Sequence, residues 1–179
     1  MSTPCRILVA GIGNIFHGDD AFGVEVVSEL SKSELPEDVD AADFGIRGYD
    51  LAYAIMEGYE AVILIDATAR GNAPGTLYLI ELDTEGLTKS ETELPDGHTL
   101  DPVHVLQLVQ SLGGHTDRLY LVGCEPGVLE TEDGQIGLSE SVQDAVPRAV
   151  EMIRTLLGKR RPRAITGFAE IWKAHIARN

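Results

Sequence analysis

The chain has 179 residues, of which 44% are hydrophobic, and this length and composition suit one packed domain rather than a disordered chain. Its formal net charge of −15 disfavours nonspecific binding to nucleic acid or to an anionic membrane. No apolar run approaches the roughly 18 residues of a membrane span, and the first residues lack the pattern of a secretory signal. The two cysteines, Cys5 and Cys124, match neither a CxxC motif nor a disulfide framework, so we expect a cytoplasmic protein.

The charge is distributed unevenly along the chain. Residues 159–179 hold six lysines and arginines against one acid, a net charge of +5, which leaves −20 on residues 1–158. We therefore expect an α/β domain over 1–158 and a basic C-terminal tail over 159–179. Apolar and aromatic residues in this tail recur at helical spacing and predict a short amphipathic helix, which packs on the acidic body or docks a partner subunit: Phe168, Ile171, Trp172, His175 and Ile176.

Short apolar runs alternate with segments of helical periodicity along residues 1–158. The apolar runs predict strands at 6–10, 38–43, 61–66, 75–82 and 118–127, the last of which runs into a turn. The periodic segments predict helices at 19–31, 48–57, 101–112 and 139–157, and the polar segment 83–98 is expected to be a long loop. Strands that alternate with helices predict an α/β fold with a mostly parallel sheet and helices on both of its faces.

Three of these helices have candidate capping residues. Asp19 or Asp20 is expected to cap the first, Asp101 with Pro102 the third, and Ser139 the last. For Asp19, capping is preferred to a chemical role.

The glycine loop "AGIGNIFHGDD" after the first strand has two interpretations. A dinucleotide-binding fingerprint requires G-x-G-x-x-G, and Gly11 and Gly13 fit it, but Phe16 occupies the third position. Asp19 and Asp20 would also repel a phosphate at the helix N-terminus. A nucleotide- or NAD-binding module that uses the Gly11–Gly13 turn is therefore the alternative rather than the preferred interpretation.

The second interpretation is a metal or acid–base site made by Asp20, Asp66 and His98. Asp20 follows the first strand, Asp66 ends the "AVILID" strand, and His98 precedes the third helix, so all three are expected at the carboxyl edge of the sheet. Imidazole and carboxylate ligands suit divalent ions such as nickel or zinc. A simpler interpretation stays open, in which the aspartates cap helices or bind loop backbone and His98 is an ordinary loop residue.

Three segments, "ILVAGIGNIFHGDDAFG", "VILIDA" and "DGHTLDPVHVL", resemble in their order and spacing the nickel–iron hydrogenase maturation endopeptidases. The resemblance covers roughly residues 6–157. It implies a three-layer α/β/α sandwich with a twisted, mostly parallel sheet. It also implies a peptidase that removes a C-terminal extension from the nickel-loaded hydrogenase large-subunit precursor.

The resemblance further assigns residues to the site. The family's metal-contacting positions fall on Asp20, Asp66 and His98, which would bind nickel, either carried by the precursor or held at the site, and perform the catalysis. Gly45, Arg47 and Gly48 are expected to contact the substrate. Whether nickel polarises the scissile carbonyl, or is recognised while a carboxylate acts as general base, stays open. A noncatalytic metal-dependent chaperone of the large subunit is the remaining alternative.

No other protease motif competes with this site. The sequence has neither an HExxH helix nor a GxSxG elbow. Cys5 and Cys124 are expected to be small core residues rather than nucleophiles.

Overall fold

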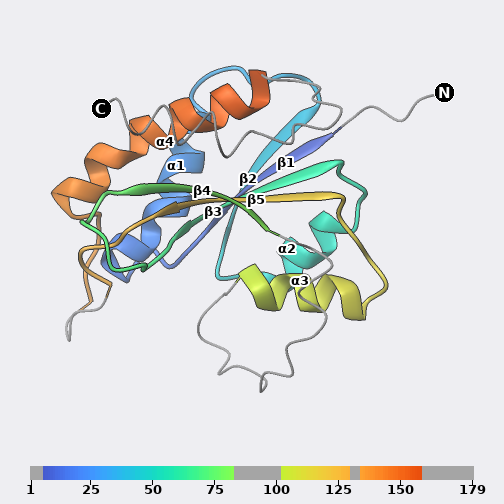
Figure 1. Cartoon of the computed structure of the whole chain (residues 1–179), viewed down its shortest axis with the longest axis horizontal. Helices are drawn as coiled ribbons and strands as arrows, with labels where there is room; N and C mark the ends of the chain where they lie inside the picture. Colours follow the sequence, from blue (N-terminus) through green and yellow to red (C-terminus); the bar gives the residue numbers. More distant parts are fainter. Residues whose placement is uncertain (1–5, 83–101, 130–133, 159–179) are drawn as a thin grey trace.

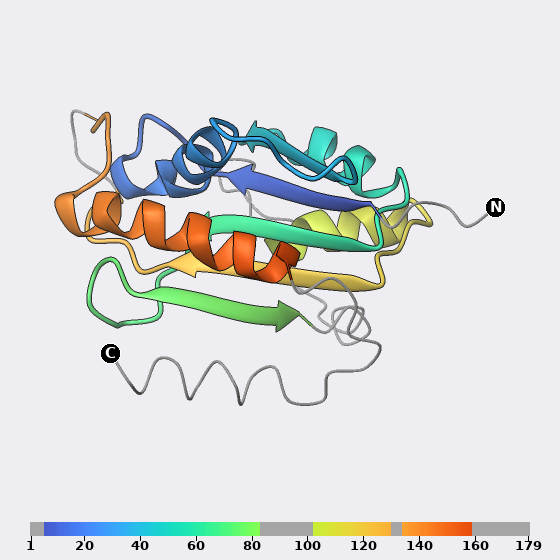
Figure 2. The ribbon, with the colours of Figure 1, turned by 90° about the horizontal axis from the view of Figure 1, so that it is seen from above.

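The computed structural model describes residues 6–82, 102–129 and 134–158. Within these residues, five strands form one sheet in the order β2-β1-β3-β5-β4: β1 (Ile7–Ile12), β2 (Val39–Gly45), β3 (Ala61–Ala67), β4 (Leu77–Leu82) and β5 (Arg118–Cys124). The pairings of β1 with β2, β1 with β3, and β3 with β5 are parallel, whereas β4 runs antiparallel to β5 at the edge (Figure 2). Each strand lies where the sequence predicts one.

Helices cover both faces of this sheet. Residues Gly18–Ala21 form a 3₁₀ turn, η1, and the α-helices are α1 (Phe22–Leu30), α2 (Gly48–Ile55), α3 (Pro102–Ser111) and α4 (Glu140–Gly158). Helices α1 and α4 lie on one face, and α2 and α3 lie on the other (Figure 1). The predicted three-layer α/β/α sandwich with a mostly parallel sheet is thereby confirmed.

The strands are continuously apolar because both of their faces are buried. In β1, Val9 packs in the core on the α1 and α4 side, while Leu8 and Ala10 pack in the core on the α2 and α3 side. In β3, Ile63 packs in the core on the α1 and α4 side, and Val62 packs in the core on the α2 and α3 side. This two-residue alternation is the side-chain geometry of a strand between two helical layers.

The amino ends of β1, β2 and β3 are joined by a small polar network. Arg6 donates from Nη2 to Asp40 Oδ2 over 2.7 Å and to the Tyr59 hydroxyl over 2.9 Å, and that hydroxyl donates to Asp40 over 3.0 Å. Burial and the neighbouring Asp40 carboxylate raise the pKa of Tyr59 to about 12. The amino edge is therefore held by side chains, and the connections that follow β1, β2, β3 and β5 begin at the opposite, carboxyl edge.

Some predictions fall outside the described residues: the loop at 83–98, the Asp101 cap, and the tail at 159–179 with its amphipathic helix. The division at residue 158 therefore stays a prediction. In the described part of the chain, no helix is both long enough and apolar enough to span a membrane.

Candidate functional site

Close backbone contacts at three glycines bring η1 and α1 onto the ends of β1 and β3. A Cβ atom on Gly13 would lie 1.7 Å from the Asp20 carbonyl oxygen, and one on Gly11 would lie 2.4 Å from that of Gly23. A Cβ atom on Gly23 would lie 2.1 Å from the carbonyl oxygen of Ile65 in β3. The space beside Gly11 and Gly13 is therefore filled by the chain's own backbone, which explains these glycines without a bound phosphate.

The two candidate aspartates lie at the carboxyl edge, as predicted. Asp20 is part of η1, the first element after β1, and its Oδ2 accepts a hydrogen bond of 2.8 Å from the Asn14 N–H. Asp66 is the second-to-last residue of the neighbouring strand β3 and follows Ile65, which pairs with Gly11 of β1. Both residues are partly buried, which is typical of groups that are held in place yet accessible. His98, the third predicted member, lies outside the described residues.

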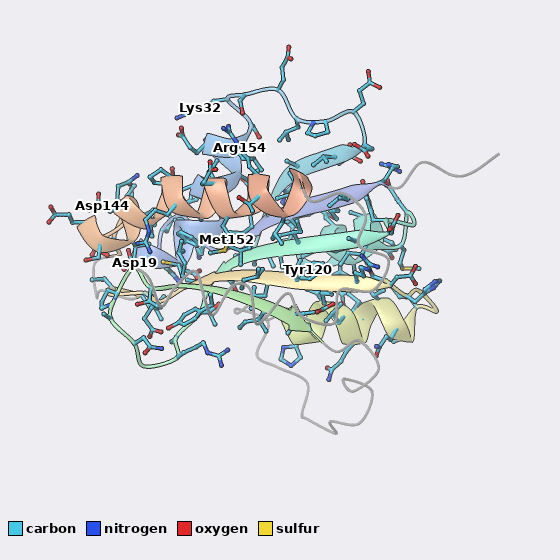
Figure 3. The ribbon with its side chains drawn as sticks, turned by 45° about the horizontal axis from the view of Figure 1, so that its top comes forward. Asp19, Lys32, Tyr120, Asp144, Met152 and Arg154 are labelled. Carbon is cyan, nitrogen blue, oxygen red and sulfur yellow. The ribbon has the colours of Figure 1, made fainter. Side chains whose placement is uncertain are left out.

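Asp19 has a role that the sequence did not predict. Neither Asp19 nor Asp20 caps α1, because the capping position is Ala21 and no side chain bonds there. The Asp19 side chain is 0% exposed and accepts four hydrogen bonds: from the N–H groups of Gly127 (2.7 Å), Val128 (2.7 Å) and Ser139 (2.6 Å) and from the Ser139 hydroxyl (2.8 Å). Figure 3 shows Asp19 beneath the first turn of α4.

Burial disfavours the charged form of Asp19, but the hydrogen bonds from Ser139, Val128 and Gly127 outweigh it and lower the pKa of the carboxyl. Ser139 precedes α4 as predicted, and its carbonyl accepts the first bonds of that helix. Its hydroxyl donates to the Asp19 carboxylate, so Ser139 both begins α4 and binds Asp19.

A second buried carboxylate, Glu125, was missed. It follows β5 and accepts hydrogen bonds from the N–H groups of Arg70 (2.8 Å) and Gly71 (3.0 Å) and from the Tyr78 hydroxyl. The Tyr78 bond is the main cause of a lowered Glu125 pKa. Glu125 thereby fixes the connection that follows Asp66. A charged residue directly after a buried strand, in "LVGCEPG", was the signal available in the sequence.

The connection between β2 and α2 lies beside the glycine loop. Gly45 has a φ of 52° and accepts at its carbonyl a 3.0 Å hydrogen bond from the Gly13 N–H, and Gly48 is the first residue of α2. The helix predicted to begin at residue 48 is therefore confirmed at its start, and Gly45 forms a turn with positive φ. Arg47 folds back on its own turn: Nε donates to the Phe44 carbonyl over 3.1 Å, and Nη1 lies 3.7 Å from Asp50.

Exposed apolar side chains gather on the connections at this edge. Phe16 is 60% exposed and Ile136 is 83% exposed. Their two segments run side by side, since the Gln135 N–H donates to the Phe16 carbonyl over 3.2 Å. Ile46 and Tyr49, around Arg47, are also exposed. Apolar groups presented to solvent by adjacent loops are typical of a surface that binds another chain.

Cys124 is unsuited to nucleophilic chemistry. It is fully buried at the end of β5, and burial together with the charge of Asp19 raises the pKa of its thiol to about 12. Its predicted role as a core residue is confirmed, and Cys5 lies outside the described residues. Over the residues that the structure covers, no three His, Cys, Asp or Glu side chains form a metal-binding group. The predicted set needs His98, which lies beyond them.

The architecture is thus that of a three-layer α/β protein whose loops bring carboxylates to the carboxyl edge of a parallel sheet, a common place for a ligand or substrate site. A model of the hydrogenase maturation protease family matches residues 24–156 of the chain. The chain belongs to this family, whose members are endopeptidases, and the resemblance seen in its motifs is confirmed.

Individual relatives agree with this assignment. The hydrogenase 2 maturation protease of Escherichia coli is 33% identical over 154 residues, which cover 85% of this chain and 90% of that protein. Among solved structures, the hydrogenase maturating endopeptidase HybD of E. coli superposes with a TM-score of 0.69 at 29% identity, covering 86% of this chain and 93% of that one. The hydrogenase 2 maturation peptidase of a Thaumarchaeota archaeon gives a TM-score of 0.66 at 33% identity, covering 86% and 98%.

Proposed function

We propose that this chain removes a C-terminal extension from the nickel-loaded large-subunit precursor of a nickel–iron hydrogenase. Membership of the hydrogenase maturation protease family makes it a hydrolase that acts on such a precursor. The single observation that carries the site assignment is that Asp20, in the turn that follows β1, and Asp66, at the end of the adjacent parallel strand β3, lie at the same edge of the sheet. We place this step in the cytoplasm, as the sequence predicts.

In this proposal Asp20, Asp66 and His98 contact the nickel of the precursor and the peptide bond to be cut. Two carboxylates and an imidazole are donors that suit a borderline divalent ion, and nickel is here part of the substrate. The carboxylate of Asp20 is partly buried and is oriented by the hydrogen bond that its Oδ2 accepts from the Asn14 N–H. A metal ion supplies polarisation of a carbonyl, and a carboxylate of the site takes the proton of the attacking water.

The connection between β2 and α2 is proposed to bind the tail of the substrate. Gly45 and Gly48 are partly exposed and carry no side chain, which lets a peptide approach the backbone closely, and Arg47 supplies an exposed cation beside them. The exposed side chains of Ile46 and Tyr49 offer apolar contact area on the same segment. An extended peptide needs both kinds of contact, because backbone bonds give affinity and side-chain contacts give selectivity.

The relatives that are named as hydrogenase maturation proteases or as hydrogenase expression/formation proteins support neither alternative function. The glycines that suggested nucleotide binding, Gly11 and Gly13, pack against the chain's own carbonyl groups, so they are explained without a bound nucleotide. The chaperone alternative predicts binding of the precursor without any change in its mass, so the experiment below separates it from a protease.

The experiment is intact-mass spectrometry of a nickel-loaded large-subunit precursor before and after incubation with the protein. We expect loss of one defined C-terminal peptide, and no loss from the nickel-free precursor. Asp20→Asn, Asp66→Asn and His98→Ala should each reduce processing by at least about 100-fold, because each removes a group required in the transition state.

Asp144→Asn is the matched control, because it makes the same change of charge on an exposed residue of α4 (Figure 3). It should process at the wild-type rate. Full activity of any of the three site variants would remove that residue from the proposed site. A precursor that is bound but never shortened would refute the protease and favour the chaperone.

A further inference from the structure

The turn that carries Asp20 is fastened on one side to the connection between β5 and α4. The Asp19 N–H donates to the Val128 carbonyl over 2.8 Å, and the Gly18 N–H donates to the Gln135 carbonyl over 2.8 Å. The four hydrogen bonds to the buried Asp19 carboxylate join the same two segments. These partners lie more than 100 residues from Asp19 in sequence, so the chain's local preferences cannot supply this attachment.

On its other side, η1 rests against the sheet. The Asp20 carbonyl fills the place where Gly13 would carry a Cβ atom, and Gly23 sits against the carbonyls of Ile12 and Ile65. The four-residue turn is therefore held between the strand ends and the β5–α4 connection. One of these two supports is backbone packing, and the other is centred on the Asp19 side chain.

We infer that Asp19 is a positioning residue, which holds η1 so that the Asp20 carboxylate stays in place beside the end of β3. This inference rests on the proposed function, in which Asp20 takes part in the reaction. Asp19 itself is fully buried and cannot contact a substrate, so it acts only through its neighbour.

A carboxylate is the side chain that this location requires. All four of its partners are donors, and an ionised carboxylate has only acceptor sites. In Asp19→Asn, the amide NH₂ group would face at least one backbone N–H, and two donors repel each other.

The first test follows the Asn14 amide by hydrogen exchange in the protein alone. This amide donates to Asp20 Oδ2, so its protection reports where the Asp20 carboxylate lies. We expect Asp19→Asn to speed exchange at Asn14 at least tenfold more than at Leu64, a fully buried residue of β3. Ser139→Ala, which removes one of the four bonds and leaves the backbone donors, should give a smaller change in the same direction.

The second test measures single-turnover processing at saturating enzyme. We expect Asp19→Asn to reduce the rate constant about 10- to 100-fold with little change in precursor affinity, as for a misplaced catalytic group. The control is a substitution of Ile153, a buried residue of the core that contains α1 and α4. Of Ile153→Val and Ile153→Ala, the variant whose melting temperature matches that of Asp19→Asn is used. It should keep the wild-type rate below its melting transition, because it loses stability without moving η1.

The two tests separate the inference from the proposed function. Unchanged exchange at Asn14 in Asp19→Asn overturns the inference, even if the wild type cuts the precursor. Faster exchange with a wild type that cuts no precursor supports the positioning of Asp20 and refutes the proposed function. Equal loss of rate in Asp19→Asn and in the Ile153 control also overturns the inference. If Asp19→Asn does not fold, the exchange of Ser139→Ala decides, and no change at Asn14 overturns it.

Discussion

The Cys124 side chain is buried beside two carboxylates, and this environment predicts an unreactive thiol. With a pKa of about 12, about one thiol in ten thousand is ionised at pH 8, and the thiolate is the reactive form. In a Cys5→Ser background, we expect iodoacetamide to modify Cys124 far more slowly in the native protein than in urea, as measured by intact mass. Processing should persist after reagent treatment. Inactivation that keeps pace with labelling of Cys124 would contradict this prediction.

The lowered pKa of Asp19 makes part of the protein's stability depend on pH. Its folded pKa lies below the ordinary value of 3.8, so its contribution is present above that value and is lost as the pH falls through the folded pKa. We therefore expect the difference in melting temperature between the wild type and Asp19→Asn to be largest above about pH 5 and to shrink toward pH 3. A difference that stays constant, or that grows in acid, would show that Asp19 is not ionised in the native state.

Asp19 also shows which properties of a single residue can be predicted from the sequence and which cannot. Two adjacent aspartates before a helix are both ordinary cap candidates, and the sequence offered no local means of separating them. Their environments differ because the partners of Asp19 are brought from residues 127–139 by the fold. The placement of Asp20 and Asp66 at the carboxyl edge was predictable from strand order, whereas the buried bonds of Asp19 and Glu125 depend on tertiary contacts.

At the scale of elements, the contact of α1 with β1 and β3 depends on Gly23. A Cβ atom there would lie within 2.3 Å of the Ile12 and Ile65 carbonyl oxygens, and these backbone atoms cannot move aside without shifting strands. We expect Gly23→Ala to lower the free energy of unfolding by at least about 2 kcal/mol and to reduce processing, as measured by urea unfolding and by precursor mass.

Gly158→Ala is the matched control for this prediction. Gly158 ends α4, and a Cβ atom added there meets nothing within 4 Å. Its replacement should raise stability by up to about 1 kcal/mol, because alanine favours the helix. Similar destabilisation by both substitutions would show that the contacts of Gly23 are not its cause.

The elements themselves were predictable because their patterns are strong. Strands buried on both faces give continuous apolar runs, so β1 and β3 were located within two residues. The predicted start of the first helix, at residue 19, was less accurate, because residues 18–21 form a 3₁₀ turn and α1 begins at Phe22. The direction of β4 also had a signal: the nine residues after β3 are too few for the crossover that a parallel strand requires.

At the scale of the whole molecule, the described residues form two cores, one on each face of the sheet, without the basic tail. We expect deletion of residues 160–179 to leave a protein that melts cooperatively, because each face of the sheet already has its helical layer. Circular dichroism during heating is the measurement, with the full chain as reference. Loss of a cooperative transition would mean that the tail belongs to the folded unit.

The position of β5 sets an order of events during synthesis. This strand lies between β3 and β4 although it follows both in sequence, and the donors to Asp19 come later still, as far as Ser139. A nascent chain that has emerged only through β4 already contains Asp20 and Asp66, but it lacks β5, which pairs with both β3 and β4, and the segment that fastens η1. Such non-local pairings are slow to form. On the proposed function, we therefore expect proteolytic activity to arise only after the chain has left the ribosome as far as Ser139.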